Sequence, residues 1–272
     1  MSAYVPLSKS KHAGFGWKQP LHYTFTANTD MVAILAEEID KVMPVLPLAF
    51  RGQKEPSGKN SYELVALLSP IANRNLFLKS DGSWLSGHVP VQFRGYPFRM
   101  MTVADNGEQV VCFDQDSGLL TESGSTETQT FFNDDGEPSP EFTRYLEFLQ
   151  QYEQRRTLTQ TAVDTLAELD LLVPWNLVVK DGDKQKKMRS GIFKVNPEAL
   201  QQLAAEPLYK LNQCGALSIA YGQLLSEQRT QNFGELLRIQ RDFKEEGSKT
   251  ASLEEIASLF GSNSDMLNFD KF

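Results

Sequence analysis

The sequence predicts an α+β protein in which an antiparallel β meander packs against helices, mostly within a single domain. Short apolar segments separated by turn-forming pairs fill the first half of the chain, whereas apolar residues recur at helical spacing after Ser139. The 272 residues are 40% hydrophobic and 10% aromatic, which is enough to bury a sizeable core. We therefore divide the chain into a flexible leader over residues 1–20, an α+β domain over 21–237 and an acidic tail with a short helix over 238–272.

The predicted domain begins with a strand and a helix. Apolar and polar residues alternate over residues 21–25, and this period of two predicts a strand. Over residues 31–43 the apolar side chains fall on one face at helical spacing. Asp30 can cap this segment and Pro44 forbids its continuation, so we expect one amphipathic helix.

Turn-forming pairs divide the following residues into the meander. Gly58, Gly82 and Gly107 each follow a polar residue, and such pairs favour tight hairpins because glycine adopts a positive φ without steric penalty. The strands predicted around these turns cover residues 45–50, 62–68, 76–79, 98–104 and 110–113.

The second half of the domain is predicted to be mainly helical. Ser139 followed by Pro140 marks a helix N-terminus, because serine caps the first turn and proline suits the first helical position. Apolar residues at helical spacing continue to Leu169. One bent helix and two helices with a break near Arg155 both fit this pattern.

Shorter elements follow Pro174. Residues 175–195 predict a second hairpin around a charged turn, and Asn196 can cap the next helix. Residues 207–215 predict a short helix that Gly215 ends in a left-handed conformation. The segment 216–225 fits either a core helix or a strand followed by a helix.

Composition argues against several classes of function. The net charge is −8, and the basic run over 184–189 lacks the interleaved aromatics that stack on bases, so we expect no nucleic-acid binding. No uncharged apolar run approaches the roughly 20 residues that cross a bilayer, so we expect no membrane span. The first residues lack the apolar stretch of a secretory signal. Cys112 and Cys214 lie among apolar neighbours, as buried free thiols do. We therefore predict a cytoplasmic protein.

Three groups of motifs follow one another in a recognisable order. These are Asn75–Leu78 before Asp81–Trp84, Val89–Pro90 before Arg94–Phe98, and a loop over 131–136 before the long helix. Across about residues 17–233, this order resembles the bacterial SapC family. The resemblance implies an accessory role beside surface-layer, peptide-transport or nutrient-uptake systems, and it assigns no catalytic residue.

The sequence shows no assembled catalytic set. The histidines His12, His22 and His88 fall in the leader, a strand and a loop, and no G-x-S-x-G motif supplies a nucleophile. No cluster of histidines, cysteines or carboxylates has the spacing of metal ligands, and the pair Gly14 and Gly16 lacks the third glycine of a phosphate-binding loop. We therefore predict no metal and no cofactor, and favour a protein that is not an enzyme.

The densest constellation of polar and aromatic residues lies in the meander. A pocket in which arginine, tyrosine and tryptophan converge can bind a carboxylate or a peptide terminus. The alternative is that these aromatics belong to the core and that Arg94 pairs with a surface acid. The candidate ligand-binding residues are Trp84, His88, Arg94, Tyr96 and Arg99.

The tail contains a second candidate binding element. Ser252 and Glu255 match a capping box, so a short helix is predicted to begin there. Apolar clusters in an acidic segment are typical of linear docking motifs, which bind a partner or fold back onto their own domain. The candidate docking residues are Leu259, Phe260, Leu267 and Phe269.

These observations combine into a prediction of function. We expect a non-enzymatic cytoplasmic accessory protein of the SapC family that binds a peptide or a partner protein. The alternative is an enzyme, or an enzyme subunit, acting on a small amino-acid-like or peptide substrate, with Arg94 holding a carboxylate and His88 or Tyr96 moving protons. The sequence leaves the ligand and the oligomeric state open.

Overall fold

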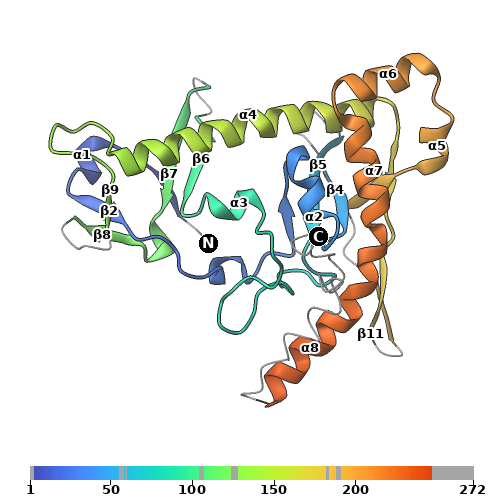
Figure 1. Cartoon of the computed structure of the whole chain (residues 1–272), viewed down its shortest axis with the longest axis horizontal. Helices are drawn as coiled ribbons and strands as arrows, with labels where there is room; N and C mark the ends of the chain where they lie inside the picture. The colour runs from blue at the N-terminus through green and yellow to red at the C-terminus, as the bar shows by residue number, and fades with distance from the viewer. Residues whose placement is uncertain are drawn as a thin grey trace, which may run out of the picture.

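Helices and antiparallel sheets pack along one long helix. The computed structural model describes residues 3–54, 58, 60–103, 107–123, 128–181, 184–187 and 191–246. Helix α4 (Pro140–Glu168) runs along the long axis of the molecule and passes over two groups of strands (Figure 1). Neighbouring strands in each of the described sheets run antiparallel, and helices cover them, so the predicted α+β class is confirmed.

A five-stranded sheet forms the larger part of the core. Its strands are β3 (Met31–Ala33), β4 (Leu48–Lys54), β5 (Asn60–Leu67), β10 (Leu172–Pro174) and β13 (Ile192–Val195), in the order β10-β13-β4-β5-β3. The end of β5 is buried at every residue over 64–67, which is typical of a strand covered on both faces. Helix α4 packs on β5, and helix α7 (Ala216–Ser226) packs on β4 and β13.

Two three-stranded sheets lie under the first half of α4. One contains β1 (Tyr4–Pro6), β7 (Gln109–Asp114) and β6 (Phe98–Thr102), in that order. The other contains β8 (Leu120–Glu122), β2 (Phe15–Trp17) and β9 (Gln129–Thr130). The two sheets contribute Trp17, Phe98 and Phe113 to a second hydrophobic cluster, which also contains Phe142 and Leu149 of α4.

Trp17 is the centre of this second cluster. Its side chain is 0% exposed, its ring stacks on Phe131 with 5.2 Å between centroids, and it meets Phe98 edge-on at 5.0 Å. Phe142 and Tyr145 of α4 also contact the Trp17 ring. Aromatic groups in these geometries gain stability beyond their buried area. Trp17 therefore joins the N-terminal strands to the long helix.

The N-terminal elements differ from the prediction. The segment 1–20, predicted as a flexible leader, contains β1, helix α1 (Lys9–His12) and β2. The strand predicted over 21–25 is wrong, because this segment bends into the 3₁₀ turn η1 (Thr24–Thr26). The helix predicted over 31–43 is wrong in its first half, where β3 pairs with β5 before the turn η2 (Ala36–Glu38) and the helix α2 (Ile39–Val42). Sheet pairing has overridden the local helical spacing.

The meander turns follow the prediction more closely. Gly82 and Gly107 have φ angles of 81° and 72°, as tight turns require. The predicted strands over 98–104 and 110–113 are confirmed as β6 and β7, which form one hairpin. The segment 76–79 makes only an isolated bridge, between Leu78 and Trp84.

The structure of the C-terminal half decides between one helix and two after Ser139, and between a helix and a strand followed by a helix over 216–225. Helix α4 is continuous, and the Ser139 side chain accepts a hydrogen bond from Phe142 N at 3.0 Å, as a cap does. Asn196 caps helix α5 (Pro197–Gln201), Gly215 has φ 76° after helix α6 (Ala205–Gln213), and residues 216–225 are helical. The predicted second hairpin is two nested pairs, β10 with β13 and β11 (Val178–Asp181) with β12 (Lys184–Lys187).

Helical structure extends into the region that we predicted as the tail. After the 3₁₀ turn η4 (Glu227–Gln231), helix α8 covers Asn232–Glu246. The predicted helix after Ser252 and the docking residues Leu259, Phe260, Leu267 and Phe269 lie outside the described residues. The division of the chain into leader, domain and tail stays a prediction.

Candidate functional site

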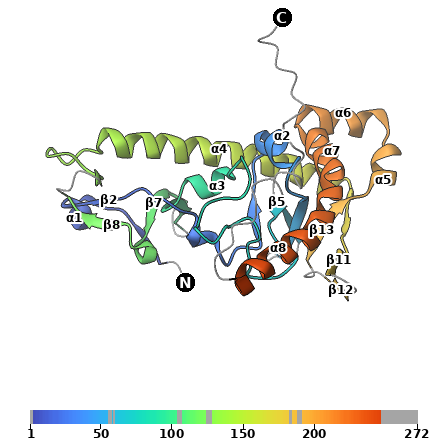
Figure 2. The same cartoon turned by 60° about the horizontal axis from the view of Figure 1, so that its bottom comes forward.

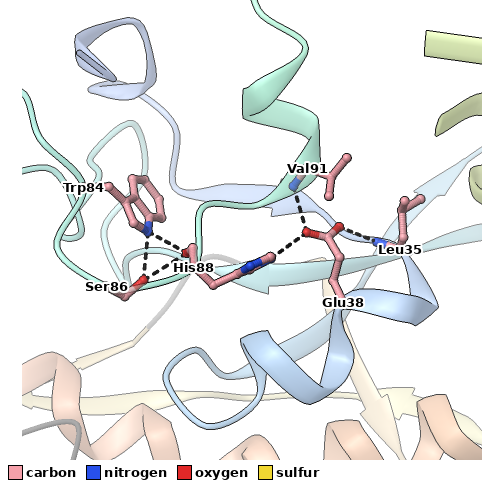
Figure 3. Close-up of polar contacts among 6 residues, drawn as sticks. All are labelled: Leu35, Glu38, Trp84, Ser86, His88 and Val91. Carbon is pink, nitrogen blue, oxygen red and sulfur yellow. Dashed lines mark hydrogen bonds and ion pairs between the residues drawn. The ribbon is translucent and has the colours of Figure 1, made fainter. Parts of the chain in front are cut away.

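A buried carboxylate joins three segments at the centre of the molecule. Glu38 is 4% exposed, and its Oε2 accepts a hydrogen bond from Leu35 N at 3.0 Å. Its Oε1 accepts one from Val91 N at 2.7 Å, and His88 Nε2 lies 3.0 Å from the same oxygen (Figure 3). A carboxylate is stable in such a buried position only when its oxygens are hydrogen-bonded. Glu38 therefore fixes η2, the His88 loop and the start of helix α3 (Val91–Arg94).

The loop that carries His88 is held by a second set of hydrogen bonds. Trp84 Nε1 lies 2.8 Å from Ser86 Oγ and 2.9 Å from the His88 carbonyl oxygen, to which it donates (Figure 3). The Ser86 hydroxyl donates to the same carbonyl at 3.1 Å. Because that hydroxyl gives its proton to the backbone, His88 does not activate Ser86 as a nucleophile in this arrangement.

The five candidate residues of the sequence do not surround one cavity. Trp84 and His88 meet in the loop just described. Arg94 is exposed at the end of α3. The Tyr96 ring stacks on Phe25 at 3.8 Å, and burial together with the charge of Asp114 raises the pKa of Tyr96 to about 12, so its hydroxyl stays protonated at neutral pH. The Arg99 guanidinium lies over the Tyr4 ring, 5.5 Å from its centroid.

A pocket of about 360 Å³ lies between α3, β6 and α4, and its lining includes Val91, whose N–H donates to Glu38. Figures 1 and 2 show α3 beside α4, between the β6–β7 hairpin and the five-stranded sheet. The apolar wall of the pocket comes from Phe98, Met100, Phe148 and Leu149, and the polar wall comes from Gln92, Tyr152, Glu153 and Arg156. Of the five candidate residues, Arg99 alone lines this pocket.

Of the four charged side chains that line the pocket, Glu63, Glu153 and Arg156 form ion pairs, whereas Arg99 lies over the Tyr4 ring. Arg156 Nε lies 2.7 Å from Glu153 Oε2, and Glu63 forms an ion pair with Arg51. Burial, and then the charge of Glu153, raises the pKa of Tyr152, so its hydroxyl is neutral. Gln92 Oε1 accepts a hydrogen bond from Ala33 N at 3.0 Å. Within the described part of the chain, neither the Tyr152 hydroxyl nor the Gln92 amide nitrogen has a hydrogen-bond partner.

Sequence reasoning missed Glu38, Gln92 and the α4 wall. Phe148, Tyr152 and Arg156 recur at intervals of four along the helix, but that spacing also fits a helix face without a binding function. No local sequence pattern marked Gln92, because its role depends on the hydrogen bond from Ala33 N in a strand distant in the sequence.

No helix of the described ranges is long and apolar enough to cross a membrane. Within those ranges, no group of three or more histidines, cysteines and carboxylates is arranged to hold a metal ion.

The fold and the pocket define an α+β protein with antiparallel sheets and a pocket beside the second hydrophobic cluster, whose Phe98, Phe148 and Leu149 help to line it. The model of the SapC family matches residues 7–233, so the chain belongs to the SapC family, as the motifs predicted. The match also includes most of the predicted leader. No curated protein and no solved structure matches the chain significantly.

Proposed function

We propose that this SapC-family protein is a non-catalytic binding protein that holds a peptide segment of a partner in the pocket between α3, β6 and α4. One observation carries the proposal: the two acidic and two basic side chains that line the pocket balance in formal charge, and the groups of Gln92 and Tyr152 that lack hydrogen-bond partners among the described residues are neutral. A peptide backbone supplies neutral donors and acceptors to such groups, and apolar side chains suit the Phe98 and Phe148 wall. We propose such a partner in a surface-layer, peptide-transport or nutrient-uptake system, the association that the resemblance implies.

The arrangement of the polar residues supports binding over catalysis. Glu38, Ser86 and the His88 carbonyl are hydrogen-bonded within the scaffold, and Tyr96 is stacked on Phe25. An enzyme of the kind considered above needs Arg94, His88 and Tyr96 around one substrate, and these side chains lie in different surroundings.

Filling the pocket is expected to abolish peptide capture. A Cβ atom on Gly95 would lie 3.4 Å from Phe148 and 3.6 Å from Leu149, so the side chain of Gly95→Leu enters the pocket. The backbone of Gly95 has a negative φ that leucine also adopts. Peptides enriched from a phage-displayed random heptapeptide library on the full chain are expected to bind Gly95→Leu at least about tenfold more weakly, by isothermal titration calorimetry.

A matched glycine controls for the added side chain. Gly87 is exposed, and a Cβ atom there would meet nothing within 4 Å, so Gly87→Leu is expected to bind the same peptides as the wild type. Thermal melting checks that both variants are folded. The proposal is wrong if no peptide is enriched, or if the enriched peptides bind Gly95→Leu and the wild type equally.

A further inference from the structure

The pocket exposes the free edge of a sheet. In the order β1-β7-β6, strand β6 pairs with β7 on one side only. Residues 98–102, which make up β6, all line the pocket, so the unpaired edge borders it. An edge strand presents a row of backbone donors and acceptors that another strand can pair with.

The register of the β6–β7 hairpin identifies these groups. Val103 N donates to Glu108 O at 2.8 Å, and Asp114 N donates to Pro97 O at 3.0 Å. Since hydrogen-bonded and non-hydrogen-bonded pairs alternate along an antiparallel ladder, the backbones of Arg99 and Met101 face β7. The backbone N–H and C=O groups of Phe98, Met100 and Thr102 therefore point away from β7.

The outward groups of β6 lack protein partners in the described structure. Phe98 N donates to Gly95 O at 2.8 Å, but the N–H and C=O groups of Met100 and Thr102 form no hydrogen bond with a described residue. They repeat every two residues, or about 6.7 Å, which is the spacing of a partner strand. Met100 is half-buried and Thr102 is exposed, so their outward N–H and C=O groups are accessible to a peptide that can complete the ladder.

The walls of the pocket suit the side chains of such a strand. Phe98 and Met100 face the cluster that includes Phe148 and Leu149 of α4. A strand paired with β6 would place every second side chain on this apolar side and the others on the side of Arg99 and Met101. Met101 is 42% exposed, so the peptide side chains on the side of Arg99 and Met101 are less restricted in type than those on the apolar side.

We infer that the ligand of this pocket is an extended peptide segment with apolar residues at alternate positions, which binds by adding a strand to the free edge of β6. This inference rests on the proposed function and specifies the ligand and its mode of binding. The ligand recognised is a partner peptide, because the pocket between α3 and α4 has room for a narrow chain beside β6. A second copy of this protein paired edge to edge is the competing occupant.

Removal of one outward N–H group tests the pairing. Met100→Pro deletes a donor that faces the pocket and leaves the ladder with β7 intact, as proline does on edge strands. We expect it to weaken binding of the enriched heptapeptides by about fivefold or more, whereas Met100→Leu keeps the N–H and binds within about twofold of the wild type. N-methylation of each peptide amide in turn is expected to weaken binding at alternate positions only, a readout that holds even if Met100→Pro fails to fold.

The outcomes separate the inference from the proposed function. Loss of binding in Gly95→Leu without a period of two in the N-methyl series would overturn strand addition and leave the binding function standing. Equal binding to Gly95→Leu and the wild type would overturn both. A dimer in sedimentation that Met100→Pro converts to a monomer, with no peptide captured, would assign the edge to a second copy and contradict the inference.

Discussion

Replacement of Trp17 by alanine is expected to lower the free energy of unfolding by about 3–5 kcal/mol, the range for large aromatic side chains removed from a core. Trp17 is fully buried and contacts Phe98, Phe131 and two aromatic residues of α4, so its loss leaves a cavity between β2 and that helix. Urea unfolding followed by circular dichroism measures the change.

Leu21 supplies the control for Trp17. The sequence predicted that the ordered domain begins at Leu21, yet this side chain is 88% exposed. Leu21→Ala is therefore expected to change the free energy of unfolding by less than about 0.5 kcal/mol. Equal effects of the two substitutions, or no effect of Trp17→Ala, would show that the N-terminal segment is not part of the core.

Removal of the Glu38 carboxylate is expected to cost about 3 kcal/mol of folding free energy. Glu38→Ala leaves the N–H groups of Leu35 and Val91 and the ring of His88 without their acceptor in a site that water reaches poorly. Because Val91 begins α3, we also expect this variant to bind the enriched peptides more weakly. Denaturant melts and calorimetric titration measure the two effects.

The neighbouring acid is a matched control. Glu37 is exposed and pairs with Arg155 at the surface, where an ion pair contributes less than about 1 kcal/mol. Glu37→Ala is therefore expected to unfold close to the wild type. If the Glu37 and Glu38 variants lost the same stability, the carboxylate of Glu38 would have no special structural role.

Features encoded by neighbouring residues could be predicted from the sequence. Ser139 and Asn196 cap helices, and Gly82, Gly107 and Gly215 adopt positive φ angles, because each depends on a few adjacent positions. The order of the SapC motifs likewise predicted the family that the comparison shows.

Features that depend on distant contacts could not be predicted. Residues 31–33 have helical spacing, but they pair with β5, which lies more than 30 residues further along the chain. The burial of Trp17 depends on Phe131 and α4, and the role of Glu38 depends on Val91. The pocket is built from five separate segments of the chain, so its residues carry no shared local pattern.

Residue-resolved hydrogen exchange of the full chain, with and without an enriched heptapeptide, tests the central claim most directly. We expect the peptide to slow exchange at the amides of Met100 and Thr102, which face the pocket, and to have little effect at Met101, whose amide already faces β7. Unchanged exchange at Met100 and Thr102, with protection elsewhere on the molecule, would contradict peptide binding at the β6 edge.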